Sequence, residues 1–162
     1  MTTFDIQPYV GAFPIEFGMK RRTVHALLGR PRDTTKVGLS PILFEYYPNQ
    51  TFNIGYDGKG RVVHVGFWPG RVRLEVCGRQ LWSPRRQPDP NIRLLKLDPT
   101  PIAYAGFLIY RKLGVITTGF YENDPNQHAV TIFPRSEWDD RLADALANAI
   151  KPDLSKYQRR TK

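Results

Sequence analysis

The chain has 162 residues and a hydrophobic fraction of 41%, which fits one globular domain or two small units that share a core. No apolar run approaches the ~20 residues that a membrane-spanning helix needs, so no candidate transmembrane helix is present. The 24 basic residues outnumber the 15 acidic ones, and the resulting net charge of +9 would attract acidic protein faces, nucleic acid or anionic lipid.

A short helix is expected soon after the N-terminal segment. Val24, Leu27 and Leu28 stand at i, i+3 and i+4, which gives the helix one apolar stripe. Gly29 lies where a left-handed C-terminal cap belongs, and Pro31 prevents continuation. Basic residues crowd the first turn, where the helix dipole would favour acids. Tertiary contacts must therefore hold this end of the helix.

Strands follow the helix and carry alternating side chains. The first three are FEYY (44–47), FNIGY (52–56) and VVHVGF (62–67), and turn-forming residues separate them. Such alternation is typical of an antiparallel sheet with one buried face. After a Pro-Gly break, RVRLEV (71–76) is expected to form a fourth strand.

The second half repeats this order. A Pro- and Arg-rich connector leads into a short helix that is expected over 91–97. Strands are then expected over 106–110, 113–121 and 128–133. The segments FLIY, VITTGF and AVTIF correspond to FEYY, FNIGY and VVHVGF, so the meander is expected to occur twice.

The last expected helix begins at Ser136, with Asp139 completing a variant of the capping box, and Pro152 ends it. Its apolar face is formed by Trp138, Leu142, Ala145, Leu146, Ala149 and Ile150. The residues beyond it hold five basic side chains against one acid and are expected to be flexible.

These elements predict an α+β fold. It would consist of two tandem units, each a helix with a three- to four-stranded antiparallel meander, and a C-terminal helix. The expected boundaries are 1–83 for the first unit and 92–150 for the second unit with its C-terminal helix. Residues 84–91 would be the connector, and 151–162 the basic flexible tail.

Motifs for catalysis, metal binding or phosphate binding are missing from the sequence. His25, His64 and His128 are far apart and have no partner motif, so no metal site is expected. No nucleophile elbow or Walker loop is present. We therefore expect a non-enzyme with no catalytic residues and no cofactor.

The expected location is the cytoplasm. The opening stretch MTTFDIQPYV lacks the features of a secretory signal peptide. Cys77 is the only cysteine, so one chain cannot build a disulfide framework. As a free cysteine, Cys77 is expected to be buried and inert.

The alternation of the strands also predicts a surface for a macromolecular partner. If Phe52, Ile54 and Val65 face the core, the opposite face follows from parity. The residues expected there as partner-binding are Tyr47, Asn53, His64, Trp68, Arg71 and Arg73. Tyrosine, tryptophan and arginine dominate binding hot spots. In the alternative arrangement, the final helix covers this face and Trp68 belongs to the core.

The motif G-x-x-P-I-x-F-G-M … V-x-x-L-L-G-x-P, with a later G-F … Q-x-A-V-x-x-F segment, resembles small bacterial immunity proteins of polymorphic toxin systems. It is also similar to SmpA/OmlA-type modules and to the units of the β-lactamase inhibitor protein. The matching positions are Gly11, Pro14, Ile15, Phe17, Gly18, Met19, Val24, Leu27, Leu28, Gly29, Pro31, Gly119, Phe120, Gln127, Ala129, Val130 and Phe133. These are structural positions, and they predict fold better than function.

The resemblance implies an immunity protein that neutralises a cognate bacterial toxin by direct protein–protein binding. A basic inhibitor would favour a toxin with an acidic surface patch, because complementary charge speeds encounter. The alternative is a small basic nucleic-acid-binding protein, since aromatic residues and arginines interleave from Phe67 to Arg86. No membrane partner is expected.

Overall fold

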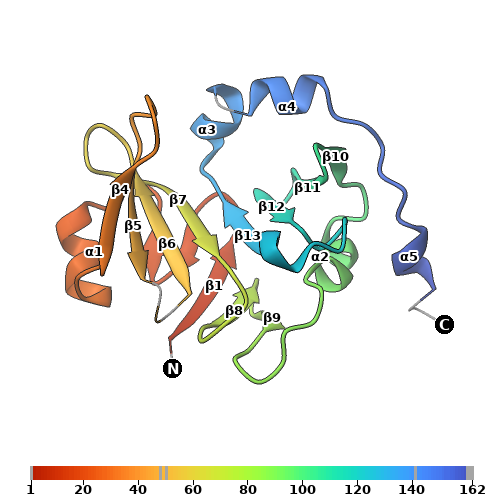
Figure 1. Cartoon of the computed structure of the whole chain (residues 1–162), viewed down its shortest axis with the longest axis horizontal. Coiled ribbons are helices and arrows are strands. Elements are labelled where there is room, and N and C mark those ends of the chain that lie inside the picture. The colour runs from red at the N-terminus through yellow and green to blue at the C-terminus, as the bar shows by residue number, and fades with distance from the viewer. Residues whose placement is uncertain (1, 48, 50, 141, 160–162) are drawn as a thin grey trace.

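The computed structural model describes residues 2–47, 49, 51–140 and 142–159. Within these residues the chain forms two β-sheets that share one hydrophobic core, with short α-helices around them (Figure 1). The α+β fold class and the dominance of antiparallel pairing confirm the coarse expectation. None of the described helices is long and apolar enough to cross a membrane.

The larger sheet has eight strands and contains every strand expected from the alternating segments except 71–76. From one edge to the other they are β10 (Ile102–Tyr104), β11 (Phe107–Tyr110), β12 (Val115–Thr118), β13 (Ala129–Ile132), β7 (Val62–Phe67), β6 (Phe52–Tyr56), β5 (Leu43–Tyr47) and β4 (Asp33–Lys36). Each half of this sheet is a run of four consecutive antiparallel strands. The two runs join where β13 pairs with β7.

The smaller sheet combines one strand expected from its alternation, β8, with four strands that the sequence did not predict. Its order is β3 (Ile15–Glu16), β2 (Gly11–Phe13), β1 (Thr3–Gln7), β8 (Arg73–Val76) and β9 (Arg79–Trp82). The expected fourth strand of the first meander is β8. It leaves the meander after the Pro-Gly break and pairs in parallel with β1.

The described helices are short and lie around the sheets. They are α1 (Arg21–Leu28), α2 (Asn91–Leu97), α3 (Arg135–Asp140), α4 (Ala143–Ala147), α5 (Ser155–Gln158) and a 3-10 turn, η1 (Pro125–Gln127). The ends of α1 and α2 agree with the sequence. Gly29 follows α1 with φ +83°, the left-handed backbone that glycine tolerates best.

The prediction of a single C-terminal helix from Ser136 to Ile150 is wrong. The structure divides it into α3 and α4, and Ser136 lies inside α3 instead of capping it. At Ile150 the backbone is extended and exchanges two 2.8 Å hydrogen bonds with Ala103 of β10. This pairing satisfies the backbone N–H and C=O groups of Ala103 on the edge strand β10. A helix that continued through Ile150 would leave them unpaired.

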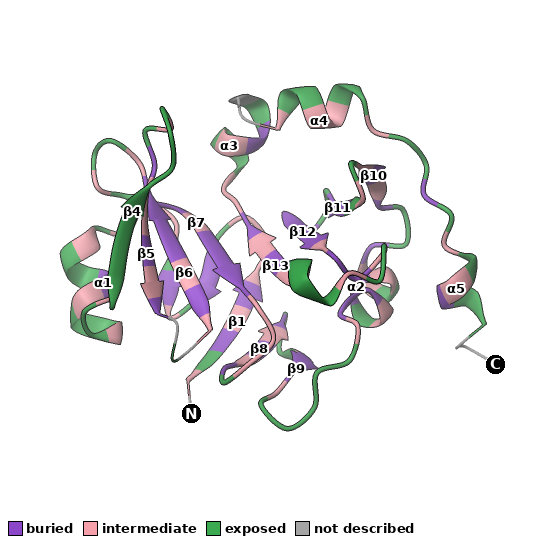
Figure 2. Cartoon of the chain, viewed as in Figure 1, coloured by how far each residue is buried: buried purple, intermediate pink, exposed green. Residues whose placement is uncertain are grey.

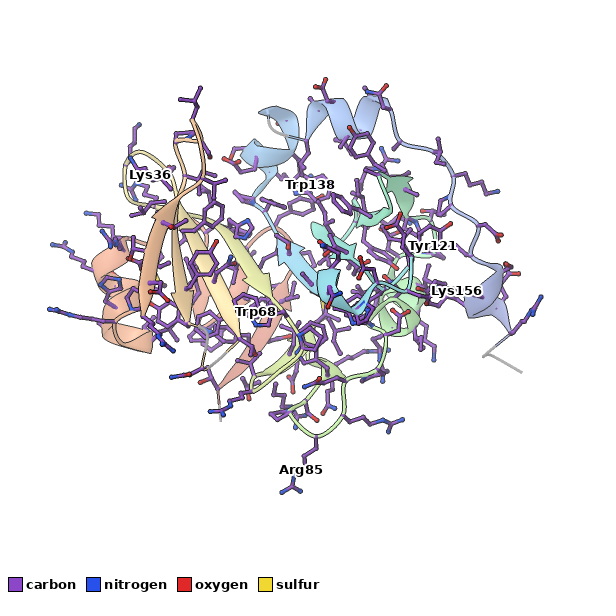
Figure 3. All side chains as sticks on the ribbon, in the orientation of Figure 1. Lys36, Trp68, Arg85, Tyr121, Trp138 and Lys156 are labelled. Atoms are coloured by element: carbon purple, nitrogen blue, oxygen red, sulfur yellow. The ribbon has the colours of Figure 1, made fainter. Side chains whose placement is uncertain are left out.

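The C-terminal segment also differs from the expected flexible tail within its described residues, 151–159. Tyr157 of α5 is buried, and its hydroxyl donates to Asp89 at 2.8 Å. The Lys156 ammonium donates to the carbonyl oxygens of Phe120 and Tyr121, at 2.8 Å each. Figure 3 places the side chains of Tyr121 and Lys156 side by side. The segment is therefore packed against the body by specific contacts.

The core lies between the two sheets, and the strand interiors are buried (Figure 2). Phe4 of β1 shows how the layers meet, because its ring contacts Phe52 and Phe67 of the larger sheet at 4.9 and 5.1 Å between centroids. The large sheet thus has one face on this core. Its other face, called the outer face below, points away from the smaller sheet.

Candidate functional site: the open half of the outer sheet face

The pairing registers extend across all eight strands, so residues can be assigned to a face along the whole sheet. One row on the outer face consists of Asp33, Tyr46, Asn53, Gly66, Thr131, Ile116, Ile109 and Ile102. The β10–β13 end of this row is apolar, whereas the β4–β7 end is mixed. The two halves of the outer face are therefore chemically different.

The apolar half is covered by the chain itself. Trp138 of α3 packs on Ile109 and Ile116, and all three are buried. Tyr9, at the β1–β2 turn, closes the edge: its ring lies 6.1 Å from that of Trp138, with the Arg135 guanidinium 4.0 Å above it. Figure 3 shows Trp138 beneath α3 and facing the sheet.

No described helix covers the half formed by β4–β7. Buried Ile42 packs beside Gly55 on this half, and the rest of it carries aromatic side chains. Phe44 of β5 packs edge-on to His64 of β7 at 5.0 Å between ring centroids. His64 in turn packs edge-on to Phe133 at 5.1 Å, and Tyr46 lies 6.5 Å from Phe44. These rings form a continuous, partly exposed band across the strands.

The open face is defined here as six partly exposed residues: Phe44, Tyr46, Asn53, His64, Trp68 and Phe133. The expected alternative, in which the final helix covers this part of the sheet, does not describe the structure. The helices α3 and α4 pack over the other half, next to Ile109 and Ile116. Aromatic side chains next to amide and imidazole groups are suited to binding another macromolecule.

Asn53 and His64 are the two expected site residues that the structure brings into direct contact. The Asn53 Oδ1 atom lies 3.2 Å from His64 Nε2. Gly66 lies beneath this pair, and a Cβ there would stand 2.5 Å from Asn53 Oδ1 and 3.1 Å from His64 Nε2. Glycine at this position therefore allows both side chains to lie flat on the sheet.

Trp68 and Arg71 lie where β7 ends, and Thr51 holds both backbones. The Trp68 amide donates to the Thr51 carbonyl at 3.2 Å, and the Arg71 amide donates to Thr51 Oγ1 at 3.0 Å. Trp68 has the same strand parity as Gly66 and is partly exposed, and Arg71 is exposed. Trp68, which Figure 3 labels, therefore lies at the end of β7 where the open face ends, and Arg71 follows it in the chain.

Tyr47 and Arg73 do not belong to the open face, which corrects the expectation. Tyr47 pairs with Phe52 and stacks on its ring at 4.6 Å, so it faces the core. Its hydroxyl donates to the Gly29 carbonyl at 3.2 Å, and burial followed by the nearby Glu45 charge raises its pKa to about 12. Arg73 lies in the smaller sheet and pairs with Glu75 at 2.6 Å.

The parity of β5 is reversed from the expectation because a carboxylate takes a core position. Glu45 is completely buried, and its two oxygens pair with Arg21 Nε and, at 2.8 Å, with His25 Nε2. Arg21 and His25 are four residues apart and so share one face of α1. The i, i+4 spacing of these two basic residues was the sequence signal that could have predicted a buried acidic partner.

A group of cationic side chains lies beside this buried pair. Arg21, Arg22, His25 and Arg30, with Pro31, line an open hollow of about 580 Å³. Arg22 and Arg30 form no ion pair with any described residue. We call these four basic residues the α1 cluster. Sequence reasoning noted the crowded basic turn but did not assign it a role.

A second hollow, of about 290 Å³, is polar and lies beside α5. It is lined by Gln87, Asp89, Phe120, Asn123, His128, Lys156 and Tyr157. His128 stacks on Phe120 at 3.9 Å, and Lys156 is already occupied by three oxygen acceptors. These contacts hold the C-terminal segment in place, and they use the hydrogen-bond donors of the Lys156 ammonium that a ligand would need.

No protein-family model, no curated protein and no solved structure matches this chain. The resemblance to immunity proteins therefore stands on the motif positions alone.

Proposed function

We propose that this protein is a cytoplasmic immunity protein that neutralises a cognate bacterial toxin by binding it directly through the open face. It performs no chemistry of its own and blocks the toxin by occlusion. The two four-stranded runs, β4–β7 and β10–β13, are taken as the tandem units implied by the resemblance.

One observation carries this proposal: the described helices that pack on the outer face of the larger sheet cover only its β10–β13 half. The covered half buries isoleucines under Trp138. The other half presents a band of rings bordered by Trp68 and Arg71. Residues of these types carry a large share of binding energy when a partner excludes water from them.

The arrangement of charge favours a protein over a nucleic acid as the partner. Binding of single strands requires cations along the same groove as the stacking rings. Here the open face contains no arginine or lysine, and Arg71 alone of the expected site arginines lies at its border. Arg85, in the interleaved segment, points away from the body in Figure 3.

The experiment tests binding and growth rescue with the product of the neighbouring gene, which the proposal takes to be the toxin. We expect a stable complex and rescue of growth on co-expression. Trp68→Ala and Tyr46→Ala should each weaken the complex by about 30-fold, the equivalent of roughly 2 kcal/mol. Phe107→Ala is the control, because Phe107 is an exposed aromatic on β11, in the other half of the sheet.

Absence of a complex, together with no rescue, would refute the function. A complex that the control weakens as much as the two open-face variants do would refute the assigned surface. Binding of single-stranded nucleic acid that Trp68→Ala abolishes would support the alternative instead.

A further inference from the structure

We propose that the α1 cluster is a second docking site, which binds a carboxylate-rich segment of the protein partner. This inference rests on the proposed function and names the chemistry of the partner. The open face would supply apolar contact, and the α1 cluster would supply charge recognition.

The α1 cluster carries a local excess of positive charge. Arg21, Arg22 and Arg30 surround one hollow, and among the described residues the buried Glu45 is the only acid paired with any of them. That carboxylate is shared with His25, so it offsets a single positive charge. Lys20 and Arg32, both exposed, add further positive charge at the two ends of α1.

Glu45 orients Arg21 before any partner binds. It accepts from Arg21 at Nε, and the terminal guanidinium nitrogens make no hydrogen bond to any described residue. Arginine presents a planar fork that matches a carboxylate. A side chain already held at one nitrogen loses less freedom when such a group binds.

In the protein without a partner, the charges at the start of α1 are arranged unfavourably. The first turn of α1 contains no acid and no side-chain cap. Positive charges at this end oppose the helix dipole, and they also repel one another. Carboxylates placed over the cluster would relieve both effects, so the cluster and an acidic segment are electrostatically complementary.

Position links the two sites. Phe44 and Tyr46 lie on the outer side of β5, and Glu45 between them points to the side that α1 covers. Only β4 lies beyond β5, and all four of its residues are exposed (Figure 2). A partner that reaches around this edge strand would contact the open face and the α1 cluster together.

The test uses the full-length protein and a ten-residue glutamate peptide as the probe. Nuclear magnetic resonance should show shifts of the Nε–Hε signals of Arg21, Arg22 and Arg30. The double variant Arg22→Glu with Arg30→Glu should weaken this binding by about tenfold or more, and added salt should weaken it further. Both residues are exposed, and an acid at the start of α1 suits the helix dipole, so the variant should fold.

The control is Arg85→Glu with Arg86→Glu, which changes the net charge by the same amount at an exposed connector. It should leave the peptide affinity within about twofold, because neither residue lines the hollow and salt screens exposed charges outside it. Equal weakening by both double variants would overturn the site, because net charge alone would then explain binding. Tighter binding of a ten-residue oligothymidine than of the peptide would refute an acidic protein segment as the partner. Self-association of the protein that the double variant Arg22→Glu with Arg30→Glu removes would also refute it.

The proposed function can fail separately. Trp68→Ala should retain the peptide response, since Trp68 is not part of the α1 cluster. The toxin complex could form while the α1 charge reversal changes the affinity of neither the peptide nor the toxin. In that case this inference alone is wrong. If the peptide binds and the neighbouring gene's product does not, the immunity function is wrong and the anion-binding site at the α1 cluster remains.

Discussion

The side-chain amide of Asn91 donates to the hydroxyl of Tyr157 at 3.0 Å, across 66 positions of sequence. The Asn91 carbonyl oxygen also accepts from Tyr110 at 2.9 Å and from Thr117 at 2.7 Å. Asn91 is fully buried, so its amide joins α2, two sheet strands and the C-terminal segment in one satisfied polar network.

The first prediction follows from this network. Tyr157→Phe removes the hydroxyl that donates to Asp89 and accepts from Asn91. Leaving the buried Asn91 amide without that partner should lower the free energy of unfolding by about 2 kcal/mol. Urea denaturation would measure the change, and hydrogen exchange should speed up over residues 150–158.

Tyr104→Phe is the matched control, because the Tyr104 hydroxyl makes no hydrogen bond to a described residue. If both variants lose the same stability, the network does not hold the C-terminal segment.

A second prediction contrasts the two halves of the outer face. Trp138→Ala removes the cover from Ile109 and Ile116 and should cost about 3 kcal/mol or more. Trp68→Ala, on the open face, should cost roughly 1 kcal/mol, since its ring is partly in water already. Thermal unfolding of both variants checks the order. A larger loss at Trp68 would mean that the open face is part of the core.

The third prediction concerns a tight turn before η1. Gly119 has φ +79°, and an added Cβ would stand 2.6 Å from the Asp124 carbonyl oxygen and 2.7 Å from the His128 amide nitrogen. Both contacts are with backbone, so Gly119→Ala should destabilise the protein by about 2 kcal/mol or more.

Gly58→Ala serves as the control, because nothing lies within 4 Å of a Cβ at that turn. It should change stability by no more than about 0.5 kcal/mol. Equal melting temperatures for the two alanine variants would contradict the turn geometry.

A fourth prediction is alkaline instability from Tyr47. Its pKa is raised from 10.0 to about 12, first by burial and then by the charge of Glu45. Between these values the folded state keeps the proton that the unfolded state has lost, so stability falls as pH rises above 10. Denaturant unfolding at pH 9, 10 and 11 should show a shallower decline for Tyr47→Phe. An unchanged slope would exclude Tyr47 as a source.

Sequence patterns located most strands of the larger sheet and the helices α1 and α2, because apolar periodicity and glycine or proline end signals are local. They failed at β4, whose sequence DTTK has no apolar residue and is fully exposed. It forms a strand because β5 offers it an unpaired edge. Such a strand is decided by its neighbour and leaves no pattern of its own.

The face assignment failed for a different reason. Alternation in FEYY fixes which residues share a face but not which face is buried. Parity arguments place apolar residues inward, whereas here Glu45 lies inward because Arg21 and His25 meet it. Asn53, His64 and Trp68 were placed correctly on the outer side because Ile54, Val65 and Phe67 are unambiguous core residues.

Two further differences arise from long-range contacts. Cys77, expected to be buried, is exposed at φ +49° in the turn between β8 and β9. The periodic segment after Ser136 does not continue as a helix to Ile150, because Ile150 pairs with Ala103 of β10. Neither the turn geometry nor the distant pairing partner is encoded in the local pattern.

The pairing of β7 with β13 has a consequence for any shortened form of this protein. It is the one antiparallel pairing that joins the two four-stranded runs. A fragment that ended after β9 would leave the backbone groups of β7 without their partners along a long apolar strand. An unpaired edge strand of this kind pairs readily with strands of other molecules. Halving this chain should therefore yield a precipitating polypeptide or a strand-exchanged dimer.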